Sequence, residues 1–362
     1  MKILFLINNF GGGGRERRMI QLLKDLSGNP DFEMQTITFS DRIDYKEVLN
    51  VKMVKHCIHF QDRKQRCDAI EDIIRSFKPD IVHSWIDTPT EMMLLGLLKG
   101  KYNYKYIAGF VADANKDKKT SFRYLAMRYT FMKADAVISN SRAGLIAKGA
   151  PMKKSHVIYN GFNFDRIPES VNKAALREEL SVTTKYLSIM FARVNDAKDW
   201  DSYINLADMS RDQDVTFLAI GNGEKLEYYQ EKINGKYSNI RFVGRRTDIE
   251  SILQLTDFSF LFTNSSKHAE GVSNSILESM ASGVPVIATE GGGTGEIITD
   301  GKDGYIIKPS DVQQAYKDML VLMQDSDLYN RTSENARNKI HSQFSIDKMT
   351  KTYMDIYHAL IN

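Results

Sequence analysis

The chain has 362 residues, 42% of them hydrophobic and 26% charged, so it is long enough to form two domains with separate cores. Its two cysteines, Cys57 and Cys67, exclude a disulfide framework and predict reduced thiols in a cytoplasmic protein. Residues 1–180 carry 30 Lys and Arg against 21 Asp and Glu, or +9, which leaves 19 against 25, or −6, for the remainder. A basic half fits an anionic membrane face or a phosphate-bearing substrate, and no nucleic-acid partner is expected.

The apolar run at residues 3–7 is too short for a signal peptide or a membrane span and predicts a buried first strand. Similar short runs alternate with helical patterns along the chain, which predicts parallel sheets with crossover helices. Residues 163–183 are polar, contain Pro168 and predict a linker between two α/β halves. The predicted strands are residues 2–8, 34–39, 80–84, 106–110, 136–139, 156–159, 187–192, 215–220, 240–243, 258–262, 284–288 and 305–307.

A glycine-rich turn at residues 11–14 follows the first predicted strand and precedes an apolar helical pattern. Four glycines let a backbone approach a ligand closely at a helix N-terminus, so Gly12, Gly13 and Gly14 are candidate ligand-binding positions. Glu16 stands where a dinucleotide fingerprint needs its third glycine, and the Gly-Lys-Ser/Thr of a nucleoside triphosphatase loop is missing. A flexible turn without a ligand is the alternative.

Three polar residues of the first half are candidates for contact with a second substrate, because they lie at or beyond predicted strand ends. They are Arg15 after the glycines, His83 at the end of strand 80–84, and Asp113 after strand 106–110. For His83, packing inside the core is the alternative.

Residues 115–133 predict a basic amphipathic helix, which can lie on anionic lipid. Packing of its apolar stripe onto its own domain is the alternative. The basic members are Lys116, Lys118, Lys119, Arg123, Arg128 and Lys133, and the apolar or aromatic members are Phe122, Tyr124, Leu125, Met127, Tyr129, Phe131 and Met132.

In the second half, Arg193 and Lys198 follow the first predicted strand. Two fixed cations would neutralise the phosphates of a nucleotide sugar and stabilise a leaving diphosphate. Gly221 and Arg245 follow the next two strands, and the carboxyl ends of parallel strands meet at one edge of a sheet. Basic loop residues taken singly are usually solvated surface, but this shared placement favours a site.

The segment EGVSNSILE, from Glu270 to Glu278, places one carboxylate in a loop and a second in a helix. The helix is expected to begin at the serine–asparagine pair and to stop at Gly283. Its first amides would hold an anion, and Glu278 would accept two ribose hydroxyls, which together describe a sugar nucleotide. A glycoside hydrolase acid–base pair and plain helix-stabilising charges are the alternatives. The candidate residues here are Glu270, Gly271, Val272, Ser273, Asn274 and Glu278.

These landmarks resemble, over nearly the whole chain, the retaining glycosyltransferases of family 4. That family has the α/β GT-B architecture, in which two Rossmann-like doubly wound parallel-sheet domains face each other across a cleft. The motifs that carry the resemblance are the glycine turn with RERR at 15–18, KPDIVHS at 78–84, ADAVISNS at 134–141, VIYNG at 157–161, AR at 192–193 with Lys198, IGNGE at 220–224, FVG at 242–244, the Glu270 to Glu278 segment and GVPVIA at 283–288.

The resemblance implies an acceptor-binding domain over residues 1–165 and a nucleotide-sugar-binding domain over residues 166–342. It implies that a final helix near 343–362 returns to the first domain. Such enzymes need no metal, because a cationic pair and a helix dipole take that role, and the seven histidines here show no metal-ligand spacing.

The resemblance also implies a role for each residue of the donor site. Arg193 and Lys198 would bind the diphosphate, and Glu278 the ribose hydroxyls. Glu270, with the amides of residues 271–273, would hold the transferred sugar, so Arg193, Lys198 and Glu270 are the catalytic candidates. The usual Glu-Gly-Phe-Pro is Glu-Gly-Val-Ser here, and a histidine common after strand 106–110 is missing.

We therefore expect a cytoplasmic or membrane-surface glycosyltransferase that retains anomeric configuration. Its donor would be a UDP-sugar, with GDP-mannose second, and its acceptor a lipid-linked or oligosaccharide glycan in bacterial surface polysaccharide assembly. A sugar-nucleotide epimerase, a sugar phosphorylase and a catalytically silent nucleotide-sugar-binding protein are the alternatives.

Overall fold

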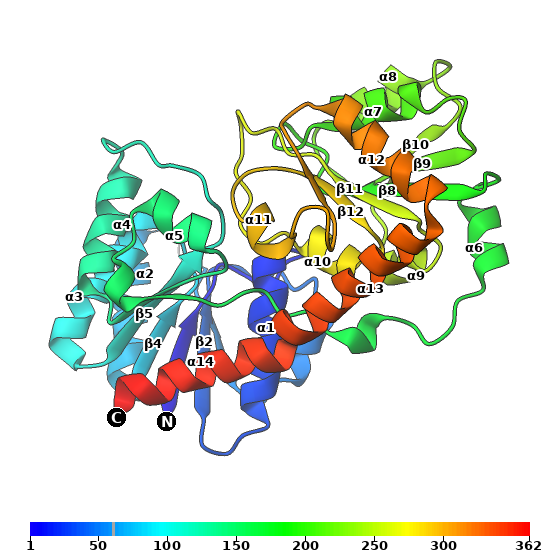
Figure 1. Cartoon of the computed structure of the whole chain (residues 1–362). Coiled ribbons are helices and arrows are strands. Elements are labelled where there is room, and N and C mark those ends of the chain that lie inside the picture. Colours follow the sequence, from blue (N-terminus) through cyan, green and yellow to red (C-terminus); the bar gives the residue numbers. More distant parts are fainter. Residues whose placement is uncertain (60–61) are drawn as a thin grey trace. The chain divides into compact units, whose positions relative to one another are not determined.

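The structure is a computed structural model that describes residues 1–59 and 62–362 (Figure 1). It contains two compact units. The first comprises Met1–Gly161 together with Ile346–Asn362, and the second comprises Phe162–Ser345.

The first unit is built on a parallel sheet of seven strands within the described residues, in the order β3-β2-β1-β4-β5-β6-β7. The strands are β1 (Lys2–Leu6), β2 (Glu33–Thr38), β3 (Val54–Cys57), β4 (Ile81–Ser84), β5 (Lys105–Val111), β6 (Ala136–Ser139) and β7 (Ser155–Val157). The strand β3 is absent from the sequence-based prediction. It lies at the sheet edge with mostly exposed side chains, so it lacks the apolar run that marks a buried strand.

Helices cover both faces of this sheet. Alternation along β1 sends Ile3 and Phe5 into one core and Leu4 and Leu6 into another. The helices are α1 (Gly14–Ser27), α2 (Arg63–Phe77), α3 (Pro89–Tyr102), α4 (Phe122–Lys133), α5 (Arg142–Lys148) and α14 (Ile346–Ile361), with the short 3-10 helices η1 (Lys46–Asn50) and η2 (Met152–Lys154). Caps fix their starts: the Asp62 side chain accepts from two backbone amides of α2, and the Ser121 hydroxyl accepts from the amide of Tyr124.

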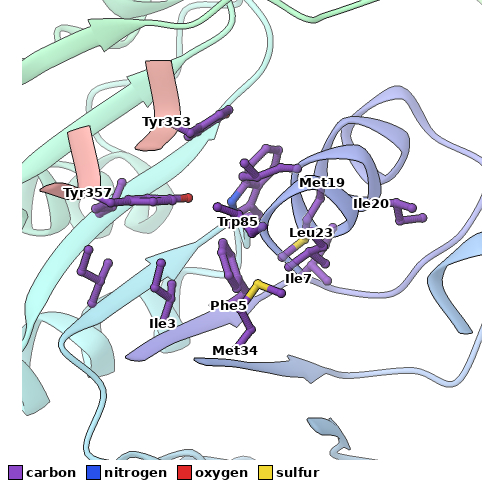
Figure 2. Close-up of a cluster of buried hydrophobic side chains, with 14 of the residues drawn as sticks. Ile3, Phe5, Ile7, Met19, Ile20, Leu23, Met34, Trp85, Tyr353 and Tyr357 are labelled. Atoms are coloured by element: carbon purple, nitrogen blue, oxygen red, sulfur yellow. The ribbon is translucent and has the colours of Figure 1, made fainter. Parts of the chain in front are cut away.

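The C-terminal helix α14 belongs to the first unit and packs beside α1 (Figure 1). Figure 2 shows Tyr353 and Tyr357 directed from α14 toward Trp85, with Phe5 of β1 beneath. Burying an aromatic or aliphatic side chain of this size stabilises by about 1.5–3 kcal/mol, so these contacts hold the helix on the sheet. The Thr350 hydroxyl adds a hydrogen bond to an Asp25 carboxylate oxygen at 2.5 Å.

His83 lies in this core and does not reach the surface, since its exposed fraction is 0%. Its ring packs against Trp85, and its Nδ1 lies 2.7 Å from the Tyr357 hydroxyl. His83 therefore packs inside the core, as the alternative interpretation predicted, and its side chain is not accessible to a second substrate. Burial, followed by the nearby Arg18 guanidinium, holds the pKa of the His83 ring well below its ordinary value of 6.5.

This buried histidine predicts a loss of stability in acid. Because the folded chain keeps His83 neutral, the unfolded chain binds the extra proton below about pH 6.5, and the free energy of unfolding falls from there downward by up to about 1.4 kcal/mol per pH unit. Urea unfolding near pH 7.5 and near pH 5 should show a smaller loss for His83→Asn than for the unmodified chain. The exposed His59→Asn serves as control, and equal losses in all three proteins would contradict the prediction.

The second unit has a parallel sheet of six strands within the described residues, in the order β10-β9-β8-β11-β12-β13. The strands are β8 (Tyr186–Phe191), β9 (Val215–Ile220), β10 (Ile240–Gly244), β11 (Phe258–Leu261), β12 (Val286–Thr289) and β13 (Tyr305–Ile307). The helices are α6 (Lys173–Glu179), α7 (Trp200–Met209), α8 (Leu226–Ile233), α9 (Ile249–Leu253), α10 (Asn274–Ala281), α11 (Thr294–Ile297), α12 (Val312–Gln324) and α13 (Ser326–Gln343), with η3 (Phe164–Arg166).

The predicted linker at residues 163–183 is wrong for most of its length. This mostly polar segment contains an amphipathic helix, α6, whose N-cap is Asn172. Leu176, Leu180 and Val182 bury their side chains in the core of the second unit against β8 and α9. The segment is therefore part of a domain, and polar composition alone did not reveal its sparse apolar stripe.

Both sheets have the doubly wound strand order, in which successive strands are added first on one side of the first strand and then on its other side. The reversals lie between β1 and β4 and between β8 and β11. Ligands of such folds bind beyond the carboxyl ends of the strands at this point. The loops that follow β8 and β11 are therefore the expected site of the second unit.

Candidate functional site

Lys198 and Glu270 meet where the loops after β8 and β11 come together. The backbone of Lys198 forms an antiparallel bridge with Thr263, which places the two loops side by side. The Lys198 ammonium forms an ion pair with the Glu270 carboxylate, and the two side chains are only 11% and 14% exposed. The His268 Nε2 lies 3.6 Å from the same carboxylate oxygen. The structure thus brings two of the predicted catalytic residues into direct contact.

Glu270 is an ionised acid. Burial alone would raise the pKa of its carboxyl, but the Lys198 charge and the contacts with His268 outweigh burial and lower the pKa to about 2. The group therefore carries a full negative charge at neutral pH, paired to a cation. The ionised Glu270 therefore stabilises the fold fully above about pH 4.3, the ordinary pKa of a glutamate. This stabilisation is lost as the pH falls from there toward the folded-state pKa of about 2.

The turn after β12 contacts the backbone of Glu270. The Gly293 amide donates to the Glu270 carbonyl at 2.9 Å. Gly292 has φ +54°, and a Cβ there would stand 2.0 Å from the same carbonyl oxygen. Only glycine fits this close approach, so the turn has a structural role in placing the acid.

We expect Gly292→Ala to displace Glu270. A left-handed backbone angle on alanine and the clash with the carbonyl would each cost about 1–3 kcal/mol. The variant should melt at lower temperature and catalyse its reaction about tenfold more slowly than the unmodified chain. Gly295→Ala is the matched control, since nothing lies within 4 Å of a Cβ at that helical position. Full activity in Gly292→Ala would contradict this role.

The helix α10 begins beside this pair, as predicted, with Ser273 as its N-cap. The Ser275 hydroxyl donates to the Phe191 carbonyl at 2.7 Å, which ties the helix start to the end of β8. Its first amides therefore lie at the same sheet edge as Lys198, where a helix N-terminus favours an anion. The helix ends at Ala281, and Gly283 follows with φ +75°. Of the other candidates, Gly271, Val272 and Ser273 are buried and Asn274 is half-buried.

Glu278 lies on α10 and is paired within the second unit. The Arg166 Nη2 lies 3.0 Å from the Glu278 Oε1 and also pairs with the Glu250 carboxylate. Neither Arg166 nor Glu250 was among the predicted site residues. No local motif marks them, because they come from η3 and α9 and meet Glu278 only in the fold.

Arg193 is the exposed member of the predicted cationic pair. Its side chain is 72% exposed, and its Nη2 lies 3.5 Å from the Glu224 Oε2. The glycines of the neighbouring loop fix its backbone: a Cβ on Gly221 would stand 1.9 Å from the Ala192 carbonyl, and one on Gly223 would stand 2.2 Å from the Val194 carbonyl. The role of Gly221 in the structure is thus close packing of two loops.

Arg245 is exposed and follows β10 directly, after Gly244 with φ +73°. It lies at the same sheet edge as the other candidates, because all six strands run parallel. Its neighbour Arg246 is instead held by Asp248 and Glu179.

The other candidates of the first unit follow β1 and β5 in the chain. A Cβ on Gly13 would stand 2.1 Å from a Glu16 carboxylate oxygen, so this glycine lets an acid fold back over the start of α1. Gly12 and Gly14 are exposed in the same turn. The Arg15 Nε contacts Glu16 at 3.3 Å, and the Asp113 Oδ1 lies 3.1 Å from the Lys148 ammonium.

Over residues 1–59 and 62–362, no three His, Cys, Asp or Glu side chains are grouped so that they could hold a metal ion. In the same residues, no helix combines the length and the apolar character needed to cross a membrane.

Residues 172–339 match the family model described as glycosyl transferases group 1. The matched residues lie within the second unit, which is therefore similar to that family. The chain is 27% identical over 244 residues to an uncharacterized glycosyltransferase of Methanocaldococcus jannaschii, covering 64% of this chain and 60% of that protein. It is 29% identical over 222 residues to the Escherichia coli UDP-Gal:alpha-D-GlcNAc-diphosphoundecaprenol alpha-1,3-galactosyltransferase, covering 58% and 55%. These two matches thus span little more than half of each relative.

The fold of the chain is GT-B. Its structure resembles that of Anabaena HepE in complex with UDP-glucose, with a TM-score of 0.83 at 20% identity, covering 99% of this chain and 100% of that one. The doubly wound strand order of both sheets agrees with this likeness.

Proposed function

We propose that this chain is a glycosyltransferase that transfers a sugar from a UDP-sugar with retention of configuration. The observation that carries the proposal is the buried Lys198–Glu270 pair beside the start of α10, at the reversal point of the second sheet. Lys198, Arg193 and the α10 amides would neutralise the diphosphate as it leaves. Glu270 would hold hydroxyls of the transferred sugar.

The choice of a uridine nucleotide is supported by two similar proteins. The E. coli relative is a UDP-Gal-dependent transferase by name, and HepE was crystallised with UDP-glucose. Glu278 would accept the ribose hydroxyls, since a carboxylate offers about four lone-pair positions to donors. Gly221 and Arg245 would border the nucleotide from the loops after β9 and β10.

We assign acceptor binding to the first unit. Gly12, Gly13 and Gly14 offer backbone amides, and Arg15 and Asp113 offer charges at the sheet edge. The E. coli relative acts by name on GlcNAc-diphosphoundecaprenol, which supports a lipid-linked glycan as the acceptor class. We propose that the reaction belongs to bacterial surface polysaccharide assembly at the cytoplasmic face of a membrane.

The first unit also presents a surface suited to anionic lipid. Phe122, Leu125 and Met132 of α4 are 58%, 58% and 65% exposed, and Ile146 of α5 is 64% exposed. Spacings of three and seven residues place the α4 side chains on one helix face. The same helix carries the exposed basic residues Arg123, Arg128 and Lys133, and η2 carries the exposed Lys153. Exposed apolar groups on a segment rich in cations suit the interface of an anionic bilayer.

Vesicle sedimentation tests this surface. At low salt, vesicles with anionic lipid should pellet the chain, and Leu125→Glu with Met132→Glu should reduce binding by about tenfold or more, because each buried methylene contributes about 0.8 kcal/mol. Leu49→Glu is the control, since Leu49 is 56% exposed on η1. Equal binding to neutral and anionic vesicles, or full binding by the double variant, would contradict the assignment.

The reaction itself is tested by donor consumption with and without acceptor. Transfer of labelled sugar from a UDP-sugar to a lipid-linked glycan, undiminished by a chelator, supports a metal-independent transferase. Donor isomerisation without acceptor would indicate an epimerase, and phosphate-dependent release with pyridoxal absorbance would indicate a phosphorylase. Donor binding without turnover across many acceptors would indicate a catalytically silent protein.

A further inference from the structure

Arg166 bridges two acids that come from different helices of the second unit. Its Nη2 lies 3.0 Å from the Glu278 Oε1 and also pairs with the Glu250 Oε1. The guanidinium lies over the Phe162 ring, with 5.4 Å between Cζ and the ring centroid. The Glu250 and Glu278 side chains are 10% and 9% exposed, against 27% for Arg166.

The charges of this triad are interdependent. Two carboxylates so far removed from water repel each other, and a cation between them stabilises both. Arg166 supplies one guanidinium for both, and its Nη2 makes both contacts. Loss of Arg166 would remove from Glu278 the ion pair that joins it to Glu250.

The triad includes Glu278, the residue proposed to bind the ribose of the donor. We propose that Arg166 is a positioning residue for the nucleotide: it holds the Glu278 carboxylate in the orientation that accepts the ribose diol, and Glu250 holds Arg166. This inference rests on the proposed function, in which Glu278 binds the ribose. One bond to Arg166 is compatible with ribose binding, because a carboxylate offers about four lone-pair positions. Arg166 therefore acts through Glu278 and does not touch the donor.

The test compares UDP with its 2′,3′-dideoxy analogue by calorimetry on the full chain. The unmodified chain should prefer UDP by about tenfold or more, because the analogue leaves buried acceptor oxygens unpaired. Arg166→Ala should lose most of that preference and raise the donor KM, with kcat changed less than about threefold. Arg166→Lys should be intermediate, because it keeps the positive charge but loses the planar guanidinium over the Phe162 ring. Arg211→Ala, which breaks an exposed pair with Asp208, should keep the full preference.

The outcomes separate this inference from the function on which it rests. Full preference in Arg166→Ala, or tighter UDP binding than in the unmodified chain, would overturn the positioning role while leaving the donor site intact. If Arg166→Ala does not fold, the Arg166→Lys variant decides: a full preference for UDP over the dideoxy analogue in that variant would likewise overturn the positioning role. Full preference in Glu278→Gln would instead remove the ribose assignment, and failure of the unmodified chain to bind UDP would remove the proposed donor.

Discussion

Lys198→Ala is expected to lower kcat for sugar transfer by about 10²–10³-fold, the effect of removing one preorganised electrostatic contact to a leaving group. The ammonium lies at the reversal point of the second sheet, beside the first amides of α10. Its charge is paired with Glu270, and it would interact most strongly with the diphosphate as negative charge develops there. Steady-state transfer assays with saturating donor measure this change.

The control for Lys198 is Lys225→Ala, which breaks a pair with the exposed Asp196 near the same sheet edge. That variant should keep kcat within about threefold, since exposed ion pairs contribute about 0–1 kcal/mol. Thermal unfolding must accompany the assay, because Lys198→Ala leaves the buried Glu270 with only His268 beside it among the ion pairs of the described residues. A folded Lys198→Ala protein with near-normal kcat would contradict the catalytic role.

Glu278→Ala is expected to weaken donor binding by about 100-fold and to raise the donor KM by a similar factor. Hydrogen bonds to a charged acceptor contribute about 1.5–3 kcal/mol each, and two ribose hydroxyls would lose theirs. The fold should survive, because Arg166 keeps Glu250 as its partner. Calorimetric titration with UDP measures the affinity.

Glu231→Ala, which removes an exposed acid from α8 in the same unit, is the control for Glu278. It should bind UDP with unchanged affinity. Since Lys198→Ala is expected to act on kcat and Glu278→Ala on KM, the two variants divide the site into a part that stabilises the transition state and a part that binds the nucleoside. Unchanged UDP affinity in Glu278→Ala would refute the ribose contact.

The alternation of apolar runs and helical patterns predicted the fold well where strands are buried. Ala136–Ser139 and Val215–Ile220 are strands at the predicted residues, because both lie in sheet interiors where every side chain is buried. The exposed edge strand Val54–Cys57 and the helix at Lys173–Glu179 were missed, since both are mostly polar. Strand order, by contrast, cannot be read from composition.

The sequence identified the parts of the candidate site that lie within continuous motifs. Glu270 and the start of α10 belong to one such segment, and Lys198 to another, and the structure brings Lys198 and Glu270 into contact. The partners Arg166 and Glu250 could not be predicted, because their contact with Glu278 arises from three separate elements of the fold. Burial of His83 depends on α14, which is distant in the chain and returns to cover it.

The central claim is that the second unit binds a nucleoside diphosphate through Lys198, Arg193, Glu278 and the α10 amides. Thermal unfolding of the full chain with UDP, GDP and ADP tests it most directly. Ligand at 100 times its dissociation constant stabilises the folded state by about 2.7 kcal/mol, so UDP should raise the melting temperature in a saturable manner. A Lys198→Ala, Glu278→Ala double variant should show little shift at the same concentration. No shift with any of the three nucleotides, or the same shift in the double variant, would contradict the claim.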